Sequence, residues 1–435
     1  MAEAAPAIAA HPDAQLWRIT LALFIAGFAT FSLIYCVQPL LGEFAREFRL
    51  DAAASSLALS STTGALAISI LAMGAFSEAF GRRGLMFASM CAAALLNLAC
   101  AFAPSWPLLL LGRGLEGLVL GGIPATAMAY LGEESPPGRL GFAMGLYVSG
   151  TAFGGMTGRV AMGVMTQLWS WRIAVGVVSV VDLVAAVAFA LLLPRSRRFV
   201  RRTGLALRDH LDAWRRHLAA PELAMLFLVA FLAMGAFVTV YNYIGFRLAA
   251  PPYHLGQAQI GLIFLIYLLG MAASSWAGAL ADRFGRAPIL VLGAMVALAG
   301  LALSLARPLA FVILGIAGLT VGFFMAHSVA SGWVGRLATR DRSHASSLYL
   351  LAYYIGASVL GSAGGAFWRW GGWVAVAGYC AVAMLGVLAL GSLLGRSAFQ
   401  TLRVSPDRAE AAIGPAAPGV EPARSRAGLG RHEDS

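Results

Sequence analysis

The chain has 435 residues, of which 60% are hydrophobic and only 12% are charged. A soluble domain usually carries about twice that share of charge, so this composition excludes an ordinary soluble enzyme. The net charge of +11 comes from arginine without any lysine, and the arginines gather at the ends of apolar runs, which excludes a nucleic-acid-binding surface.

Apolar runs long enough to cross a bilayer recur along the whole chain. We expect an all-α membrane protein with twelve transmembrane helices in two six-helix bundles. The first run has no basic segment ahead of it and is expected to be an uncleaved anchor. The predicted spans are 18–41, 53–76, 85–103, 107–131, 140–166, 172–193, 222–246, 257–279, 288–306, 308–333, 344–367 and 372–395.

The polar breaks divide the chain into two bundles, 18–193 and 222–395. A cytoplasmic tail is expected over residues 1–17 and a disordered cytoplasmic tail over 396–435. The basic segment 194–221 joins the bundles. It forms either an amphipathic helix on anionic lipid headgroups or a solvated linker, and the sequence favours neither.

The arginines also predict the orientation. With the N-terminus inside, the cytoplasmic segments hold nineteen arginines and the opposite loops hold six. This asymmetry follows the positive-inside rule and predicts that both termini are cytoplasmic, in a bacterial inner membrane.

The four cysteines lie inside apolar runs without a CxxC pair, so we expect no disulfide, metal site or cofactor.

The two bundles share a repeated loop. Gly74, Glu78, Gly81 and Arg82 follow the second span, and the matching set after the eighth span is Gly278, Asp282, Gly285 and Arg286. The offset is 204 residues, and Leu146-Tyr147 with Gly154 matches Leu348-Tyr349 with Gly356 at an offset of 202. Two matches in the same order indicate a duplicated six-helix unit, as many transporters have.

Each repeated loop has residue types suited to a conformational switch. Glycines permit a tight turn and close helix contact, and the acid can pair with an arginine in one state and lose it in the other. A turn that only sets the topology would need the same residues.

On these motifs the chain resembles the major facilitator superfamily over residues 18–395. The repeated loops are similar to motif A of that superfamily, with Glu78 in place of the usual Asp. Gly112-Arg113-Gly-Leu-Glu116-Gly117 is similar to motif B, with Glu116 in place of Gln. The resemblance implies a monomeric transporter with spans 1, 4, 7 and 10 around a central cavity.

The fifth span is similar to motif C of the drug:proton antiporters through Gly150, Gly154, Gly155 and Gly158, although it lacks the proline and gains Arg159. These glycines also suit close helix packing. Four stretches resemble the YnfM-type branch of bacterial exporters: Tyr35-Cys-Val-Gln-Pro39, Gly154–Arg159, Tyr241-Asn-Tyr-Ile-Gly245 and Leu348–Tyr354.

Ionisable residues within the spans are candidates for proton coupling, because a charge in the bilayer is costly unless it is paired or hydrated. The candidates are Arg113, Glu116, Arg159, Asp182 and His327. The first four are expected to form one polar cluster. The resemblance implies that Arg113 and Glu116, with His327 from the other bundle, line the cavity and that Asp182 is more peripheral. Among these residues Glu116 is the expected protonation site. Alternatively, Arg113 and Glu116 form a self-contained ion pair and His327 is a packed, hydrogen-bonded histidine.

Aromatic and amide side chains near the span ends are candidate substrate contacts, since such groups suit amphipathic molecules. They are Tyr35, Gln38, Tyr241, Asn242, Tyr243 and Tyr353. Tyrosines at these depths are also typical interfacial anchors.

The sequence therefore predicts a secondary transporter working by alternating access. The YnfM-type resemblance implies efflux of a small amphipathic compound or metabolite, driven by proton antiport. Uptake or facilitated diffusion of a small organic solute by the same fold is the alternative. An intramembrane enzyme lacks support, because HExxH, GxSxG and CxxC motifs are absent. A sensor with a transporter-like fold is a further possibility.

Overall fold

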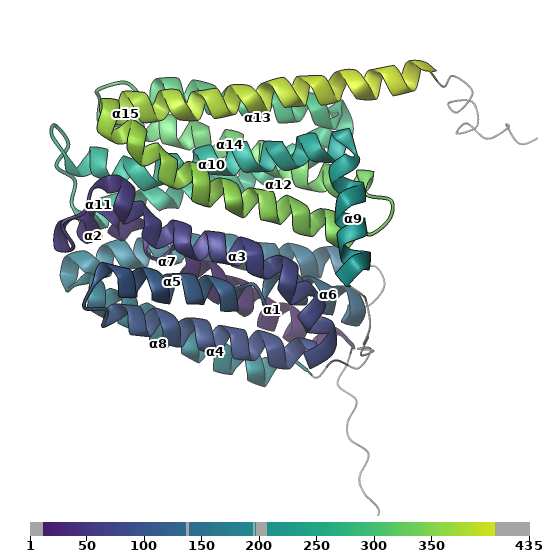
Figure 1. Cartoon of the computed structure of the whole chain (residues 1–435), viewed down its shortest axis with the longest axis horizontal. Coiled ribbons are helices and arrows are strands. Elements are labelled where there is room, and N and C mark those ends of the chain that lie inside the picture. The colour runs from purple at the N-terminus through teal and green to yellow at the C-terminus, as the bar shows by residue number, and fades with distance from the viewer. Residues whose placement is uncertain (1–11, 136–138, 195, 197–206, 405–435) are drawn as a thin grey trace, which may run out of the picture. The chain divides into compact units, whose positions relative to one another are not determined.

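The computed structural model describes residues 12–135, 139–194, 196 and 207–404, and within these residues every regular element is a helix (Figure 1). The N-terminal half contains α1 (Pro12–Tyr35), η1 (Gln38–Leu40), α2 (Leu41–Glu47), α3 (Ala52–Phe80), α4 (Arg82–Ala101), α5 (Trp106–Leu120), α6 (Pro124–Glu134), α7 (Leu140–Leu168) and α8 (Trp171–Leu192).

The helix α9 (Leu207–Ala219) follows the linker. The C-terminal half then contains α10 (Pro221–Ala249), α11 (Gln257–Leu262), η2 (Ile263–Ile266), α12 (Tyr267–Phe284), α13 (Arg286–Leu303), α14 (Leu309–Leu337) and α15 (Arg342–Val404).

The helices follow the twelve predicted spans, with one difference. The span expected at 107–131 is broken into α5 and α6, because Gly121 packs against Ser69 and Pro124 starts a new helix. The last two expected spans are two helices that meet at Gly371 and Gly372, where the backbone leaves the helical conformation, and the label α15 covers both.

Nine segments of the described residues have the length and hydropathy of a membrane span. One of them, Arg342–Arg396, is long enough for two spans. The remaining expected spans are the broken pair α5–α6 and the glycine-rich α7, which accounts for the difference from twelve.

The ends of the chain differ from the expected boundaries where they are described. The helix α1 begins at Pro12, inside the segment 1–17 expected to be a tail. The helix α15 continues to Val404, into the segment 396–435 expected to be disordered. Residues 1–11 and 405–435 lie outside the described residues, as do 195 and 197–206 of the linker.

Within the linker segment, α9 is attached to the start of α15. The Arg216 guanidinium lies 2.7 Å from the Asp341 carboxylate, and His210 Nδ1 lies 2.8 Å from His344 Nε2. Ala213 is buried, whereas Arg215 is exposed. The helix thus presents one side to the protein and the other to its surroundings.

Figure 1 shows α9 and α6 at one end of the helices, and α2 and α11 at the opposite end. We call these the linker end and the far end. Several hydrogen bonds and ion pairs join the N-terminal half to the C-terminal half between the far end and the middle of the helices. They join Gln38 to Asn242, Pro39 to Gln257, Asp51 to Arg369, Ser60 to Ser362, Thr63 to Ser358 and Gln167 to Ala258.

The duplicated unit is visible in the backbone. Gly81 and Gly285 have φ of 86° and 92°, in a conformation that L side chains rarely adopt. A Cβ on Gly154 would overlap the Phe28 carbonyl, and a Cβ on Gly356 would overlap the Phe231 carbonyl in the same way. Each half therefore repeats both the tight loop and the close helix contact.

Candidate functional site

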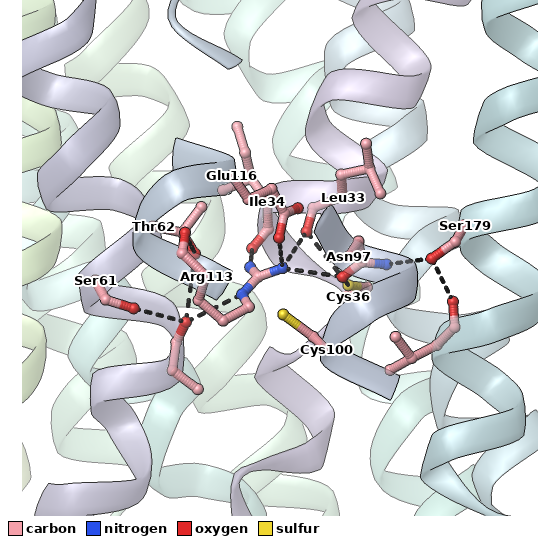
Figure 2. Close-up of polar contacts among 12 residues, drawn as sticks. Leu33, Ile34, Cys36, Ser61, Thr62, Asn97, Cys100, Arg113, Glu116 and Ser179 are labelled. Carbon is pink, nitrogen blue, oxygen red and sulfur yellow. Dashed lines mark hydrogen bonds and ion pairs between the residues drawn. The ribbon is translucent and has the colours of Figure 1, made fainter. Parts of the chain in front are cut away.

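Arg113 and Glu116 form an ion pair inside the N-terminal half (Figure 2). Both side chains have an exposed fraction of 0%, and Arg113 Nη1 donates to Glu116 Oε2 at 2.6 Å. The guanidinium also donates to the carbonyl oxygens of Leu33, Ile34 and Ala58 at 3.2, 2.8 and 3.2 Å. Because α1 ends at Tyr35 and α3 begins at Ala52, carbonyls from two helices converge on one arginine of α5.

A polar chain extends from this pair toward α8. Arg113 Nη1 donates to Asn97 Oδ1 at 3.2 Å, and Asn97 Nδ2 donates to Ser179 Oγ at 2.9 Å. The Cys36 thiol lies 3.8 Å from the same Asn97 oxygen. Sequence reasoning missed Asn97, although a buried amide in an apolar helix is itself a signal of a polar network.

Asp182 on α8 is the second acid of this region. Its exposed fraction is 1%, and it lies within electrostatic range of Glu116 and near Ser32 of α1. Neither carboxyl oxygen makes a hydrogen bond of good geometry, and Glu116 Oε1 also has no partner within the described residues. Asp182 and Glu116 are thus buried to the same degree.

Arg159 of α7 lies in a separate cage. Its guanidinium carbon is 4.0 Å from the Tyr35 ring centroid, 4.9 Å from that of Tyr267 and 5.1 Å from that of Phe264. Arg159 Nε donates to Gln38 Oε1 at 2.7 Å, and Nη1 donates to the Gly155 carbonyl at 2.6 Å. The single cluster expected from the sequence is therefore two sites, one around Arg113 and one around Arg159.

Gln38 connects the Arg159 cage to the C-terminal half. Its Nε2 donates to Asn242 Oδ1 at 2.9 Å, and both amides are nearly fully buried. A cavity of about 680 Å³ at the far end is lined by Gln38, Asn242, Tyr241 and Phe264 on its buried side. Four of the six candidate substrate contacts, Tyr35, Gln38, Tyr241 and Asn242, thus lie at or next to this junction.

The remaining two candidates differ in position. Tyr353 is half-buried and lies 4.8 Å from the His327 ring, centroid to centroid. Tyr243 is fully buried and donates its hydroxyl to the Ser362 carbonyl at 3.3 Å, which is a packing role.

His327 belongs to an aromatic group in the C-terminal half. Its Nδ1 is 2.9 Å from the Tyr349 hydroxyl, and its ring stacks on Phe323 at 5.6 Å. Phe323 stacks in turn on Phe237, which contacts Tyr267 of the Arg159 cage. Tyr267 and Phe264 were missed from the sequence, because nothing in their own spacing sets them apart from core aromatics.

The repeated loops pair with corresponding helices in the two halves, since α6 completes the fourth span and α14 is the tenth. Arg82 lies 2.5 Å from Glu133 of α6, whereas Asp282 accepts from Arg336 of α14 at 3.0 Å and from Arg286 at 3.4 Å. Gly74 lies in α3 and Gly278 in α12, while the side chain of Glu78 lies outside the described residues.

The glycines of the antiporter-like motif pack α7 against α1. A Cβ at Gly150, Gly154 or Gly158 would meet Phe24, Phe28 or Ser32 of α1, at successive turns. Gly155 instead lies beside the Arg159 guanidinium. This contact supports helix packing as the role of the first three glycines.

The charges of the buried Arg113 site do not balance if all groups are ionised. One arginine and two carboxyl groups are buried in this region, and burying an uncompensated charge is strongly unfavourable. One ionised carboxylate opposite Arg113 and one protonated carboxyl group make the site neutral. The arrangement can therefore hold a proton.

Arg113 and Glu116 are enclosed on all sides, which differs from the expected position lining a cavity.

Comparisons with known proteins agree with this architecture. The sequence profile described as Major Facilitator Superfamily matches residues 23–249. The MFS-type transporter YybF of Bacillus subtilis (strain 168) is 46% identical over 380 residues, which cover 87% of this chain and 94% of YybF. The inner membrane transport protein YnfM of Escherichia coli (strain K12) is 43% identical over 382 residues, covering 88% of this chain and 91% of YnfM.

Solved structures with the same fold are more distant in sequence. A mutant of the nucleoside transporter NupG has a TM-score of 0.71 at 14% identity, over 86% of this chain and 99% of its own. A D-xylose-proton symporter has a TM-score of 0.68 at 16% identity, over 85% of this chain and 97% of its own. At these identities the likeness concerns the fold alone.

Proposed function

Because the chain belongs to the Major Facilitator Superfamily and is a multi-pass membrane transporter, we propose that it exports a small amphipathic compound or metabolite in exchange for protons. The export direction rests on the YnfM-type motifs in the sequence. The exchange with protons rests on the site around Arg113, Glu116 and Asp182.

The arginine distribution supports a cytoplasmic linker end and both termini in the cytoplasm. The far end is then the outer face of the inner membrane. In this orientation the hydrogen bonds from Gln38 to Asn242 and from Thr63 to Ser358 belong to a state that is closed to the outside. Alternating access requires that these bonds break when the outer face opens.

The observation that carries the antiport proposal is the excess of one buried acid over arginine in the Arg113 site. Glu116 keeps its ion pair with Arg113, and Asp182 holds the proton. Because Asp182 interacts electrostatically with Glu116, proton binding at Asp182 depends on the ionisation of both carboxyl groups. Proton release occurs in the state that hydrates Asp182, because water stabilises the ionised carboxylate.

The test uses inverted vesicles that hold the purified full chain, an imposed proton gradient and a pH-sensitive dye. Amphipathic cations, acids and sugars are screened for substrate-evoked proton release. Asp182→Asn has the size of the protonated acid and is expected to fold, yet to abolish proton release. Glu116→Gln is expected to abolish release as well, with lower stability because Arg113 loses its counter-ion.

Asp212→Asn on α9 is the matched control, since it makes the same chemical change at a side chain that is 47% exposed. It should leave proton release unchanged. Release that survives both Asp182→Asn and Glu116→Gln would contradict this coupling site. Gradient-free counterflow without any proton release would mean facilitated diffusion, in either direction.

A further inference from the structure

The two buried arginines of the N-terminal half differ in how their charge is compensated. Arg113 has the Glu116 carboxylate at 2.6 Å. Arg159 has an exposed fraction of 2% and, within the described residues, no carboxylate within ion-pairing distance. Its partners are neutral: the Gln38 amide and the Gly155 carbonyl. A buried cation without a counter-ion is costly, so a role for its charge is expected.

The surroundings of Arg159 favour a planar apolar group beside the charge. Tyr35 comes from the N-terminal half, whereas Phe264 and Tyr267 come from the C-terminal half. The Phe264 ring stacks on the Tyr241 ring, with 5.1 Å between the ring centroids. The Tyr267 ring contacts the Phe237 ring, with 5.5 Å between the centroids. Aromatic rings from both halves therefore face one positive charge, that of Arg159.

The cage also lies where the two halves separate. Gln38 accepts from Arg159 and donates to Asn242, so the hydrogen bond that joins the halves is next to the guanidinium. The Nδ2 of Asn242 is buried and has no acceptor among the described residues. When the far end opens, Gln38 and Asn242 part, and Arg159 becomes accessible from the adjoining cavity of about 680 Å³.

We propose that the transported compound is an organic anion with a planar, apolar body, whose acidic group pairs with Arg159 between the two halves. This inference rests on the transport function proposed above and specifies its substrate class. The carboxylate takes the place of Gln38 on the guanidinium, and the apolar body lies against Tyr35, Phe264 and Tyr267. An organic cation of the same shape is repelled, because the site holds a buried positive charge already.

The inference also explains why a neutral amide occupies position 38. An acid there would satisfy Arg159 permanently and compete with an anionic substrate. An amide stabilises the empty site with a hydrogen bond that an anionic acceptor can replace, since a carboxylate adds the attraction of opposite charges and can bind the guanidinium through two parallel bonds.

The experiment measures binding by titration calorimetry, with the purified full chain in lipid nanodiscs. The probes are three acid–amide pairs: benzoate and benzamide, cinnamate and cinnamamide, indole-3-acetate and indole-3-acetamide. Tryptamine is the cationic counterpart of the last pair. We expect at least one acid to bind roughly tenfold or more tightly than its amide, as a charge-assisted bond in a buried site provides.

Arg159→Gln is expected to abolish the preference for the acid, and Arg159→Lys to keep part of it. Arg307→Gln removes an exposed arginine at the far end and is the control that should behave as the unsubstituted protein. Acids that bind no tighter than their amides in all three pairs would overturn the inference, whether or not the variants fold. An acid preference that persists in Arg159→Gln would overturn it too.

The vesicle assay separates this inference from the antiport proposal. Acid-selective binding without proton release would support the anion site at Arg159 and contradict the antiport proposal. Proton release evoked only by cations or neutral compounds would keep antiport and reject the anion site.

Discussion

Gln38 donates to Asn242 across the two halves while it accepts from Arg159 within its own half. Removing this amide should weaken the closed far end. We expect Gln38→Ala to shift the conformational equilibrium toward an open far end by about five- to tenfold, because one hydrogen bond contributes about 1 kcal/mol and Arg159 loses an acceptor. Spin labels at Gly42 and Ala250, in a cysteine-free chain, would report the change as a longer distance.

The control for Gln38→Ala is Thr157→Val, which removes a hydroxyl that bonds only to its own helix, at the Phe153 carbonyl. Its distance distribution should match that of the labelled parent. An unchanged distribution in Gln38→Ala would mean that other contacts hold the far end closed.

The contact between α7 and α1 depends on the missing side chain of Gly154. We expect Gly154→Ala to lower the melting temperature by several degrees, because the added Cβ would overlap the Phe28 carbonyl and overpacking of this kind costs about 1–3 kcal/mol. Fluorescence-detected gel filtration after heating measures the loss in detergent.

Gly145→Ala in the same helix is the matched control for this prediction. A Cβ at Gly145 has no neighbouring atom within 4 Å, so alanine should be neutral or slightly stabilising. Equal melting temperatures for the two variants would show that α1 moves away from α7 at little cost.

Asp51 should make a pH-dependent contribution at the far end. Its carboxylate accepts from the Ala54 amide at the N-cap of α3 and pairs with Arg369, and these contacts lower the pKa of Asp51. A lowered pKa in the folded state means that the contribution is complete above the unfolded value of about 3.9 and is lost as the pH falls through the folded value.

We therefore expect Asp51→Ala to be less stable than the parent at pH 7, by about 1 kcal/mol as for other N-cap losses, and this difference to be smaller at pH 3, below the unfolded pKa. Asp51→Asn should stay close to the parent, because asparagine also caps helices and exposed ion pairs contribute little. Thermal melts at both pH values measure the difference. A constant difference between parent and Asp51→Ala over this range would contradict the role of the ionised cap.

The loop glycine Gly81 should be sensitive to any side chain. At φ 86° and ψ 139°, alanine is strained by about 1–3 kcal/mol, so Gly81→Ala should slow transport by rearranging the loop. Gly84→Ala, where a Cβ meets nothing within 4 Å, is the control. Counterflow rates compare the two variants, and equal rates would show that the loop conformation is dispensable.

Hydropathy and the repeated loops were sufficient to predict an all-helical two-half transporter fold and its family. The details that escaped prediction are local breaks. The turn between α5 and α6 follows from Gly121 packing against Ser69, and only the three-dimensional contact reveals why the chain leaves the helix there. The helical residues from 396 to Val404 were expected to belong to the disordered tail, because their polar composition is typical of a tail.

The candidate site was predictable as a set of residue types but not as a geometry. Arg113, Glu116 and Asp182 stand out because ionisable residues are rare in apolar spans, and the structure brings them together. Arg159 is separated from these three residues because of the direction in which its side chain leaves α7. The rotation of one helix relative to its neighbours cannot be read from a single sequence. Their roles in proton coupling and substrate binding stay predictions.

The chain between Leu33 and Gln38 belongs to both sites. The carbonyl oxygens of Leu33 and Ile34 accept from Arg113, and Gln38 accepts from Arg159 only a few residues later. A shift of this short segment changes the hydrogen bonds of both arginines at once. If the transported compound binds at Arg159 and the proton binds beside Arg113, as proposed, the two binding events are thermodynamically linked and each alters the affinity for the other by the same factor.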